Sequence, residues 1–212
     1  MDISAKKLLL RRLRAAYPSP QSELNFSNDY QLVVSVMLSA QTTDKKVNEI
    51  TPLLFARYPS FTELSRARTA HIEQIIRPIN YYRTKAKHLR EMARIVQNHY
   101  LGHLPRTYNE LLALPGVGNK TAKVVLCELG CAAAFPVDTH VFRVSRRLGL
   151  AVGNSPQKVE QELCQEFAPR HWRALHHWLI LHGRRVCQAR KPLCQECFIA
   201  EICPARRQFL RS

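Results

Sequence analysis

Four cysteines near the end of the sequence form its most specific chemical pattern. They are Cys187, Cys194, Cys197 and Cys203, a Cys-x6-Cys-x2-Cys-x5-Cys array within 17 residues. Thiolates this close together repel one another unless a metal neutralises them. Zinc sites commonly use two closely spaced cysteine pairs, and here only the middle pair is close, whereas a [4Fe–4S] cluster accepts wider and uneven spacing. The spacing therefore favours a [4Fe–4S] cluster, with zinc as the alternative.

A glycine-containing turn could bind an anion. Residues 114–122 read LPGVGNKTA, and Gly116 and Gly118 allow a tight turn that points backbone N–H groups outward. The helix that follows adds the positive end of its dipole. A Gly-x-Gly pair by itself is more often an ordinary turn. The flanking helix-forming segments, 107–113 and 119–129, make it a helix–hairpin–helix, a motif that holds DNA phosphates without reading base sequence.

A lysine and an aspartate on either side of a short connection could act together. Lys120 begins the second helix of the hairpin, and nucleophilic attack requires its neutral amine. Asp138 follows residues 130–136, a small-residue connection that ends in proline. If the chain crosses there between two helical lobes, both side chains face one cleft. The alternatives are a solvated or phosphate-binding lysine and an aspartate that only caps a helix.

The charge balance indicates the class of partner. The 212 residues contain 32 Lys and Arg against 16 Asp and Glu, a net charge of +16. Such an excess favours a polyanion. The longest nearly apolar run, 124–137, contains Glu128 and is shorter than the roughly 18 residues of a membrane span. The N-terminus has only a three-leucine run and no signal peptide. Nucleic acid is therefore favoured over a membrane.

The elements that position these residues are all expected to be helices. Apolar residues recur at helical spacing, as in Val47, Ile50 and Leu54, and no run alternates with a period of two. Start signals agree: Thr107 with Glu110 forms a capping box, Asn28 with Gln31 a weaker one, and Ser155 precedes a proline. The remaining cysteines lie on apolar helix faces and are expected in the core: Cys127, Cys131 and Cys164. The predicted fold class is all-α.

Taken together, the motifs resemble the endonuclease III family. The resemblance rests on the hairpin LPGVGNKTA, the segment VDTHVFRV at 137–144, LSAQTTD at 38–44 and the cysteine array, all in the order found in the family. It implies two helical domains with a cleft between them. Residues 22–132 would form a six-helix barrel that contains the helix–hairpin–helix. Residues 1–21 and 133–212 would form a smaller helical domain that carries the [4Fe–4S] cluster loop.

The resemblance also assigns roles to individual residues. Lys120 would be the nucleophile and Asp138 its catalytic carboxylate, the four array cysteines would ligate the cluster, and Gln41 would fill the gap left by a flipped-out base. Asn80 and Tyr81 depart from the family, whose members commonly have a glycine and an aliphatic residue there. Tyr81 is the candidate wedge against the opposite strand, unless it packs with Tyr82 on a helix start. The expected DNA contacts are Gln41, Tyr81, Gly116, Val117, Gly118, Thr121, His140, Arg143, Arg190 and Lys191.

The implied activity is base excision repair by a bifunctional DNA glycosylase and AP lyase. Its substrate would be double-stranded DNA with oxidised or ring-damaged pyrimidines or abasic sites, and the protein is expected to be a cytoplasmic, nucleoid-associated monomer. One alternative is a non-catalytic helix–hairpin–helix protein with a structural metal. Another is a related adenine mismatch glycosylase. Such enzymes typically have serine at the position of Lys120 and a further C-terminal domain, whereas this chain ends nine residues after Cys203.

Overall fold

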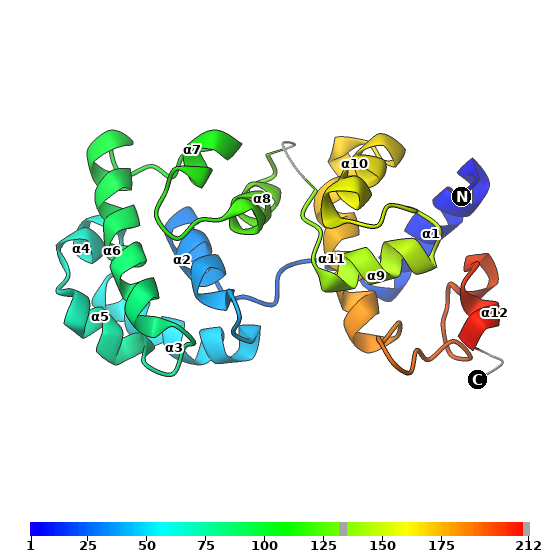
Figure 1. Cartoon of the computed structure of the whole chain (residues 1–212), viewed down its shortest axis with the longest axis horizontal. Helices are drawn as coiled ribbons and strands as arrows, with labels where there is room; N and C mark the ends of the chain where they lie inside the picture. Colours follow the sequence, from blue (N-terminus) through cyan, green and yellow to red (C-terminus); the bar gives the residue numbers. More distant parts are fainter. Residues whose placement is uncertain (132–134, 210–212) are drawn as a thin grey trace. The chain divides into compact units, whose positions relative to one another are not determined.

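The computed structural model of the chain describes residues 1–131 and 135–209. These residues form helices and connecting loops without a β-strand, which confirms the predicted all-α fold (Figure 1). The chain divides into two compact units, Ser22–Ala133 and Met1–Gln21 with Ala134–Ser212. The predicted domain boundary, between residues 132 and 133, lies outside the described residues. None of the described helices is long and apolar enough to cross a membrane.

The unit Ser22–Ala133 is built around a helix that is buried along most of its length. The apolar run 32–38 lies in the middle of α2, and each of its residues is buried. The neighbouring helices turn their periodic apolar residues toward it, including Val47, Ile50 and Leu54. The described part of this unit contains seven helices, one more than the expected six, and α7 is the predicted first helix of the hairpin. The helices are α2 (Asp29–Ser39), α3 (Asp44–Arg57), α4 (Phe61–Arg66), α5 (Thr69–Ile76), α6 (Tyr82–His99), α7 (Tyr108–Leu112) and α8 (Asn119–Glu128).

The predicted helix starts are confirmed by their hydrogen bonds. Thr107 Oγ1 accepts the backbone N–H of Glu110 at 3.4 Å and donates to the Glu110 carboxylate at 2.5 Å. Asn28 Oδ1 accepts the N–H of Gln31 at 2.9 Å. Ser155 Oγ caps the next unit's proline-initiated helix. Each cap satisfies an N–H that the first turn of a helix leaves without a partner.

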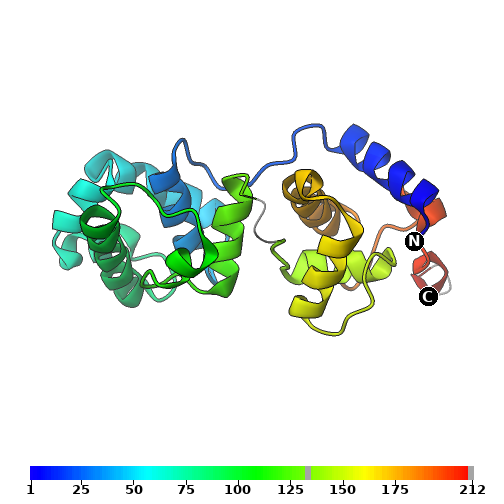
Figure 2. The same ribbon diagram turned by 90° about the horizontal axis from the view of Figure 1, so that it is seen from above.

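The second unit combines the start of the chain with its C-terminal part. Leu9 and Leu13 of α1 are fully buried in its core, and Arg12 donates to the carbonyl of Phe198 at 2.7 Å. Figures 1 and 2 show α1 beside the segment that ends the chain. The helices are α1 (Ile3–Ala16), α9 (Thr139–Arg147), α10 (Pro156–Glu166), α11 (Trp172–Arg185) and α12 (Arg206–Phe209), with 3-10 turns at Pro169–His171 and Ala200–Ile202.

A glycine brings two helices of this unit close together. A Cβ added at Gly183 of α11 would lie 3.0 Å from the Cβ of His140 on α9 and 3.1 Å from a methyl group of Val144. Such contacts are tighter than side chains normally make, so the missing Cβ permits the close approach. The close packing fixes α9, which begins after Asp138, against the helix that leads into the cysteine loop.

Candidate functional site

The hairpin between α7 and α8 has its middle residue inside and its glycines outside. Val117 is buried, and its N–H donates to the carbonyl of Leu114 at 3.1 Å. Gly116 has φ +78, and a Cβ there would lie 2.8 Å from both His88 and Met37, so glycine is required twice over. A Cβ at Gly118 would meet nothing within 4 Å. The hairpin therefore presents an open backbone edge, while Val117 anchors it in the core.

This edge has the features of an anion site. Among residues 1–131 and 135–209, the N–H groups of Gly116 and Gly118 have no protein acceptor. Gly118 is the N-cap of α8, and because glycine has no side chain, it does not cap the N–H groups of the first turn. Unsatisfied N–H groups at a helix N-terminus favour a phosphate oxygen. Val117 contributes its buried side chain, since its own N–H is already used.

Lys120 lies on this exposed edge. It is the second residue of α8 and is exposed, and Thr121 beside it is half-buried. The helix start is held by the hydroxyl of Tyr108, which donates to Asn119 Oδ1 at 2.9 Å. Because Lys120 is exposed, its amine is accessible to a molecule bound at the hairpin.

Gln41 and Tyr81 belong to two loops on the same unit. Tyr81 lines one pocket together with the hairpin residues 116–118. Its side chain is 66% exposed, whereas Tyr82 is half-buried and packs on the core. The interpretation of a packed tyrosine pair is therefore wrong for Tyr81 and holds only for Tyr82. The backbone of Tyr81 is left-handed, with φ 59.

Asp138 is the N-cap of α9, as its sequence position predicted. Its Oδ1 accepts the N–H of Val141 at 2.7 Å, and the residue is half-buried. This bond fixes the carboxylate at the start of the helix. Asp138 and Lys120 belong to different units, so the predicted cleft between them stays a prediction.

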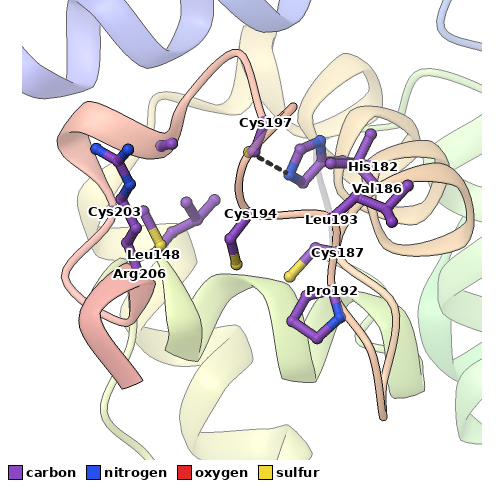
Figure 3. A pocket seen from close by; sticks show the side chains of 11 residues that line it. Leu148, His182, Val186, Cys187, Pro192, Leu193, Cys194, Cys197, Cys203 and Arg206 are labelled. Carbon is purple, nitrogen blue, oxygen red and sulfur yellow. Dashed lines mark hydrogen bonds between the residues drawn. The ribbon is translucent and has the colours of Figure 1, made fainter. Parts of the chain in front are cut away.

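The four array cysteines line a single pocket. Figure 3 shows their side chains around one space, together with apolar residues such as Leu148, Val186 and Leu193. All four are free thiols and half-buried. Burial is the main cause that raises the pKa of the Cys197 and Cys203 thiols, so both favour the thiol until a metal takes the proton's place.

The two metal hypotheses make different demands on these thiols. Among the described residues, no three His, Cys, Asp or Glu side chains are placed to hold a single metal ion. Zinc needs four ligands at about 2.0–2.3 Å from one point, whereas a [4Fe–4S] cluster spreads its four thiolates over four irons. Four thiols that line one pocket supply the four ligands that both hypotheses require, so the uneven spacing in the sequence carries the preference for a cluster.

Groups around the pocket hold its rim. Arg147 donates to the carbonyls of Gln188 at 2.7 Å and Ala189 at 2.8 Å, and the Cys203 thiol donates back to the carbonyl of Arg147 at 3.4 Å. These bonds fix the base of the loop that exposes Arg190 and Lys191. Arg190 and Lys191, the two predicted DNA contacts, therefore lie on a loop whose preceding residues are fixed by Arg147.

A buried histidine contacts one of the cysteines. His182 Nε2 lies 3.7 Å from the sulfur of Cys197 (dashed line in Figure 3), and Nδ1 lies 3.5 Å from the hydroxyl of Tyr17. Burial lowers the pKa of His182 to about 4, so the ring is neutral with one N–H. The single N–H can therefore serve only one of these two neighbours, Tyr17 or Cys197, and the tautomer decides which. No sequence motif singles out His182, because both of its partners are distant in the chain.

Arg143 has a role that the sequence did not predict. Its guanidinium donates to the carbonyls of Gly183 at 2.9 Å and Cys187 at 3.1 Å and lies 3.2 Å from His140 Nδ1. Burial is the first cause that lowers the pKa of His140. Arg143 therefore ties the start of the cysteine loop to α9. The DNA contacts expected of Arg143 and His140 stay predictions.

Residues of both units match known protein families. Residues 34–169 match the model of the HhH-GPD superfamily base excision DNA repair protein, and residues 187–203 match the iron-sulfur binding domain of endonuclease III. The Endonuclease III of Rickettsia felis is 46% identical over 186 residues, 88% of this chain and 87% of the relative. A non-covalent Endonuclease III–DNA complex matches with a TM-score of 0.90, and a trapped Endonuclease III–DNA covalent intermediate with 0.89. Both are 34% identical and match over 100% of each chain.

Proposed function

The chain belongs to the endonuclease III family, and on this premise we propose which of its residues carry out the reaction and on which substrate. It is a bifunctional DNA glycosylase and AP lyase of base excision repair, it binds DNA, and it carries a [4Fe–4S] cluster. The substrate we propose is duplex DNA with an oxidised or ring-damaged pyrimidine or an abasic site. The protein would act as a nucleoid-associated monomer.

The observation that carries the residue assignment is the exposed Lys120 on the open edge of the hairpin. In the proposed first step its neutral Nζ forms a bond to C1′ of the flipped-out nucleotide. The glycosidic bond breaks, and its electron pair leaves with the base, which takes up a proton. The sugar ring then opens to a Schiff base, which withdraws electrons. Loss of a C2′ proton breaks the C3′–O bond, and the strand is cut 3′ to the site.

Other residues of the chain would support these steps. Asp138 would stabilise the positive charge that develops on the sugar or accept a proton from the amine. The open amides of Gly116 and Gly118, with Thr121, would hold a phosphate near Lys120. The cluster would be held by Cys187, Cys194, Cys197 and Cys203, and it supplies a structural support for the loop that carries Arg190 and Lys191.

Covalent trapping tests this assignment against the non-catalytic alternative. When the protein is incubated with a damaged duplex and borohydride, the Schiff base should be reduced to a stable protein–DNA adduct. A DNA-binding protein without the chemistry gives no adduct. The presence of lysine at position 120 also favours the lyase over the adenine mismatch glycosylase, and release of undamaged adenine opposite a mismatch would reverse that preference.

Replacing Asp138 by asparagine should separate the carboxylate's charge from its capping role. Asparagine caps helices as well as aspartate does, so we expect the melting temperature to be nearly unchanged. Base excision should fall by about a hundredfold or more, because the charge that stabilises the sugar is lost. Single-turnover excision and a thermal melt measure the two effects. A rate within a few-fold of wild type would mean that Asp138 only caps α9.

Tyr81 is proposed to enter the duplex opposite the lesion and stack on the orphaned base. Its exposure beside the hairpin supports this role, since an exposed aromatic ring is accessible to a base. Base–aromatic stacking contributes roughly 1–3 kcal/mol and depends little on base identity. Tyr81→Ala should therefore weaken binding of a lesion duplex by about ten- to a hundredfold, equally across opposite bases.

The matched control is Tyr81→Phe, which keeps the ring. Binding by Tyr81→Phe should stay within a few-fold of wild type in a fluorescence anisotropy titration. Equal losses for Tyr81→Phe and Tyr81→Ala would assign the effect to the hydroxyl and would refute stacking.

A further inference from the structure

The loops that carry Gln41 and Tyr81 are joined by side-chain hydrogen bonds to the backbone. Asn80 Nδ2 donates to the carbonyl of Gln41 at 2.6 Å. Lys85 Nζ donates to the carbonyl of Ala40 at 2.6 Å and to that of Leu38 at 2.8 Å. The donors come from residues 80–85 and the three acceptors from residues 38–41. The two loops are therefore held together at the point where each exposes a candidate DNA contact.

Both candidate contacts have an unusual backbone conformation. Gln41 has φ 57 and Tyr81 has φ 59, the left-handed region that residues other than glycine rarely adopt. Such conformations persist where the surrounding structure fixes them, and they gather at functional sites. Asn80 links the two residues, because it directly precedes Tyr81 in the chain and its side chain donates to the carbonyl of Gln41.

The two donors act on different parts of the Gln41 loop. Lys85 is half-buried at the C-terminal end of α2, where its ammonium donates to the carbonyls of Leu38 and Ala40. It fixes the end of the helix, one to three residues before Gln41. Asn80 alone reaches the carbonyl of Gln41 itself among the side-chain donors of the described residues. Loss of Asn80 would thus leave α2 in place and release Gln41.

We propose that Asn80 is a positioning residue that fixes Gln41 against Tyr81, so that both side chains enter the duplex as one preorganised pair. Two loops that are already ordered lose less conformational freedom when they enter DNA than two independent loops. The inference rests on the proposed roles of Gln41 and Tyr81. It adds that their effect depends on a third residue that does not itself touch the flipped base.

The ratio of excision from duplex to excision from single strands tests this role. A single strand has no stacked partner for the pair to replace, so only the duplex rate should depend on Asn80. Asn80→Ala should lower the single-turnover duplex rate by about two- to tenfold, the net effect of one hydrogen bond, and leave the single-strand rate unchanged. Asn80→Asp, which lacks the N–H donor but keeps the shape, should behave in the same way.

Asn48→Ala is the matched control. Asn48 makes the same kind of backbone bridge in the same unit, donating to the carbonyl of Glu23 at 2.7 Å and accepting the N–H of Asn25 at 2.8 Å. This variant should leave the duplex-to-single-strand ratio unchanged. A general loosening of the unit would lower both rates for Asn48→Ala and Asn80→Ala alike, which would refute a specific role for Asn80.

The double variant shows whether Asn80 acts through Gln41. If it does, Gln41→Ala combined with Asn80→Ala has the same duplex rate as Gln41→Ala alone, whereas additive losses contradict the inference. If Gln41→Ala leaves the ratio unchanged, the proposed role of Gln41 is wrong and that of Asn80 falls with it. If Gln41→Ala lowers the ratio but Asn80→Ala and Asn80→Asp do not, only the positioning role is wrong.

Discussion

Replacing Lys120 by alanine should abolish covalent trapping, base release and strand cleavage, each by about four orders of magnitude or more, because a reaction loses most of its catalysis with its nucleophile. Binding to a lesion duplex should change little, since phosphate contacts are shared among many cations and the hairpin amides remain. Borohydride trapping measures the first effect, and a gel-shift titration measures the second. The combination of intact binding and lost chemistry identifies a nucleophile.

Lys123→Ala provides the comparison. Lys123 lies one turn further along α8, with its ammonium 5.8 Å from the centre of the Tyr108 ring. Lys123 has the same charge as Lys120 and lies on the same helix. The yield of trapped adduct should therefore change little in Lys123→Ala. If Lys120→Ala retained lyase activity, or if both variants lost it equally, Lys120 would not be the nucleophile.

Loss of a cysteine ligand should have the second large effect. The purified protein should be yellow-brown and contain about four iron and four sulfide per chain. Cys194→Ser should lose most of the iron and release the loop, because metal binding and local folding are coupled in such sites. Iron analysis, visible absorption and limited proteolysis after Val186 measure these changes.

Cys164→Ser tests whether the effect is specific to the array. Cys164 is a half-buried cysteine of α10 that packs on the core of the same unit. The variant should keep its colour and its iron. A colourless wild-type protein with one zinc per chain, unchanged by reconstitution with iron and sulfide under reducing conditions, would overturn the cluster assignment.

The parts of the site that the sequence predicts correctly are those with local causes. The N-caps at Thr107 and Asp138 and the turn at Gly116 depend on residues within a few positions of each other, and all three are found as predicted. The cysteine array is likewise predicted from the spacing of its four cysteines alone. Helix caps and turns of this kind can be predicted from a few neighbouring residues.

The positioning contacts could not be predicted, because each joins segments that the fold brings together. Asn80 reaches a carbonyl 39 residues away, and Arg143 one 44 residues away. Asparagine and arginine on a polar stretch are ordinarily solvated, so nothing in their neighbours distinguishes them. For Tyr81 the sequence left two hypotheses open, and the exposure of the residue argues against the packed pair. No short pattern indicates either that exposure or the left-handed backbone of a tyrosine.

The shared unit of α1 and the C-terminal helices determines the order in which the protein can fold on the ribosome. The indole of Trp178 donates to the carbonyl of Tyr17 across 161 residues of sequence, and Leu9 and Leu13 are buried only in that core. At roughly 5–20 residues per second, translation leaves α1 without its partners for about 8–30 s. The central unit can fold during this interval, whereas α1 keeps its leucines exposed to chaperones and to other nascent chains. The four cysteines that would hold the cluster are complete only after Cys203 has emerged, so the full ligand set becomes available in the same late interval as the partners of α1.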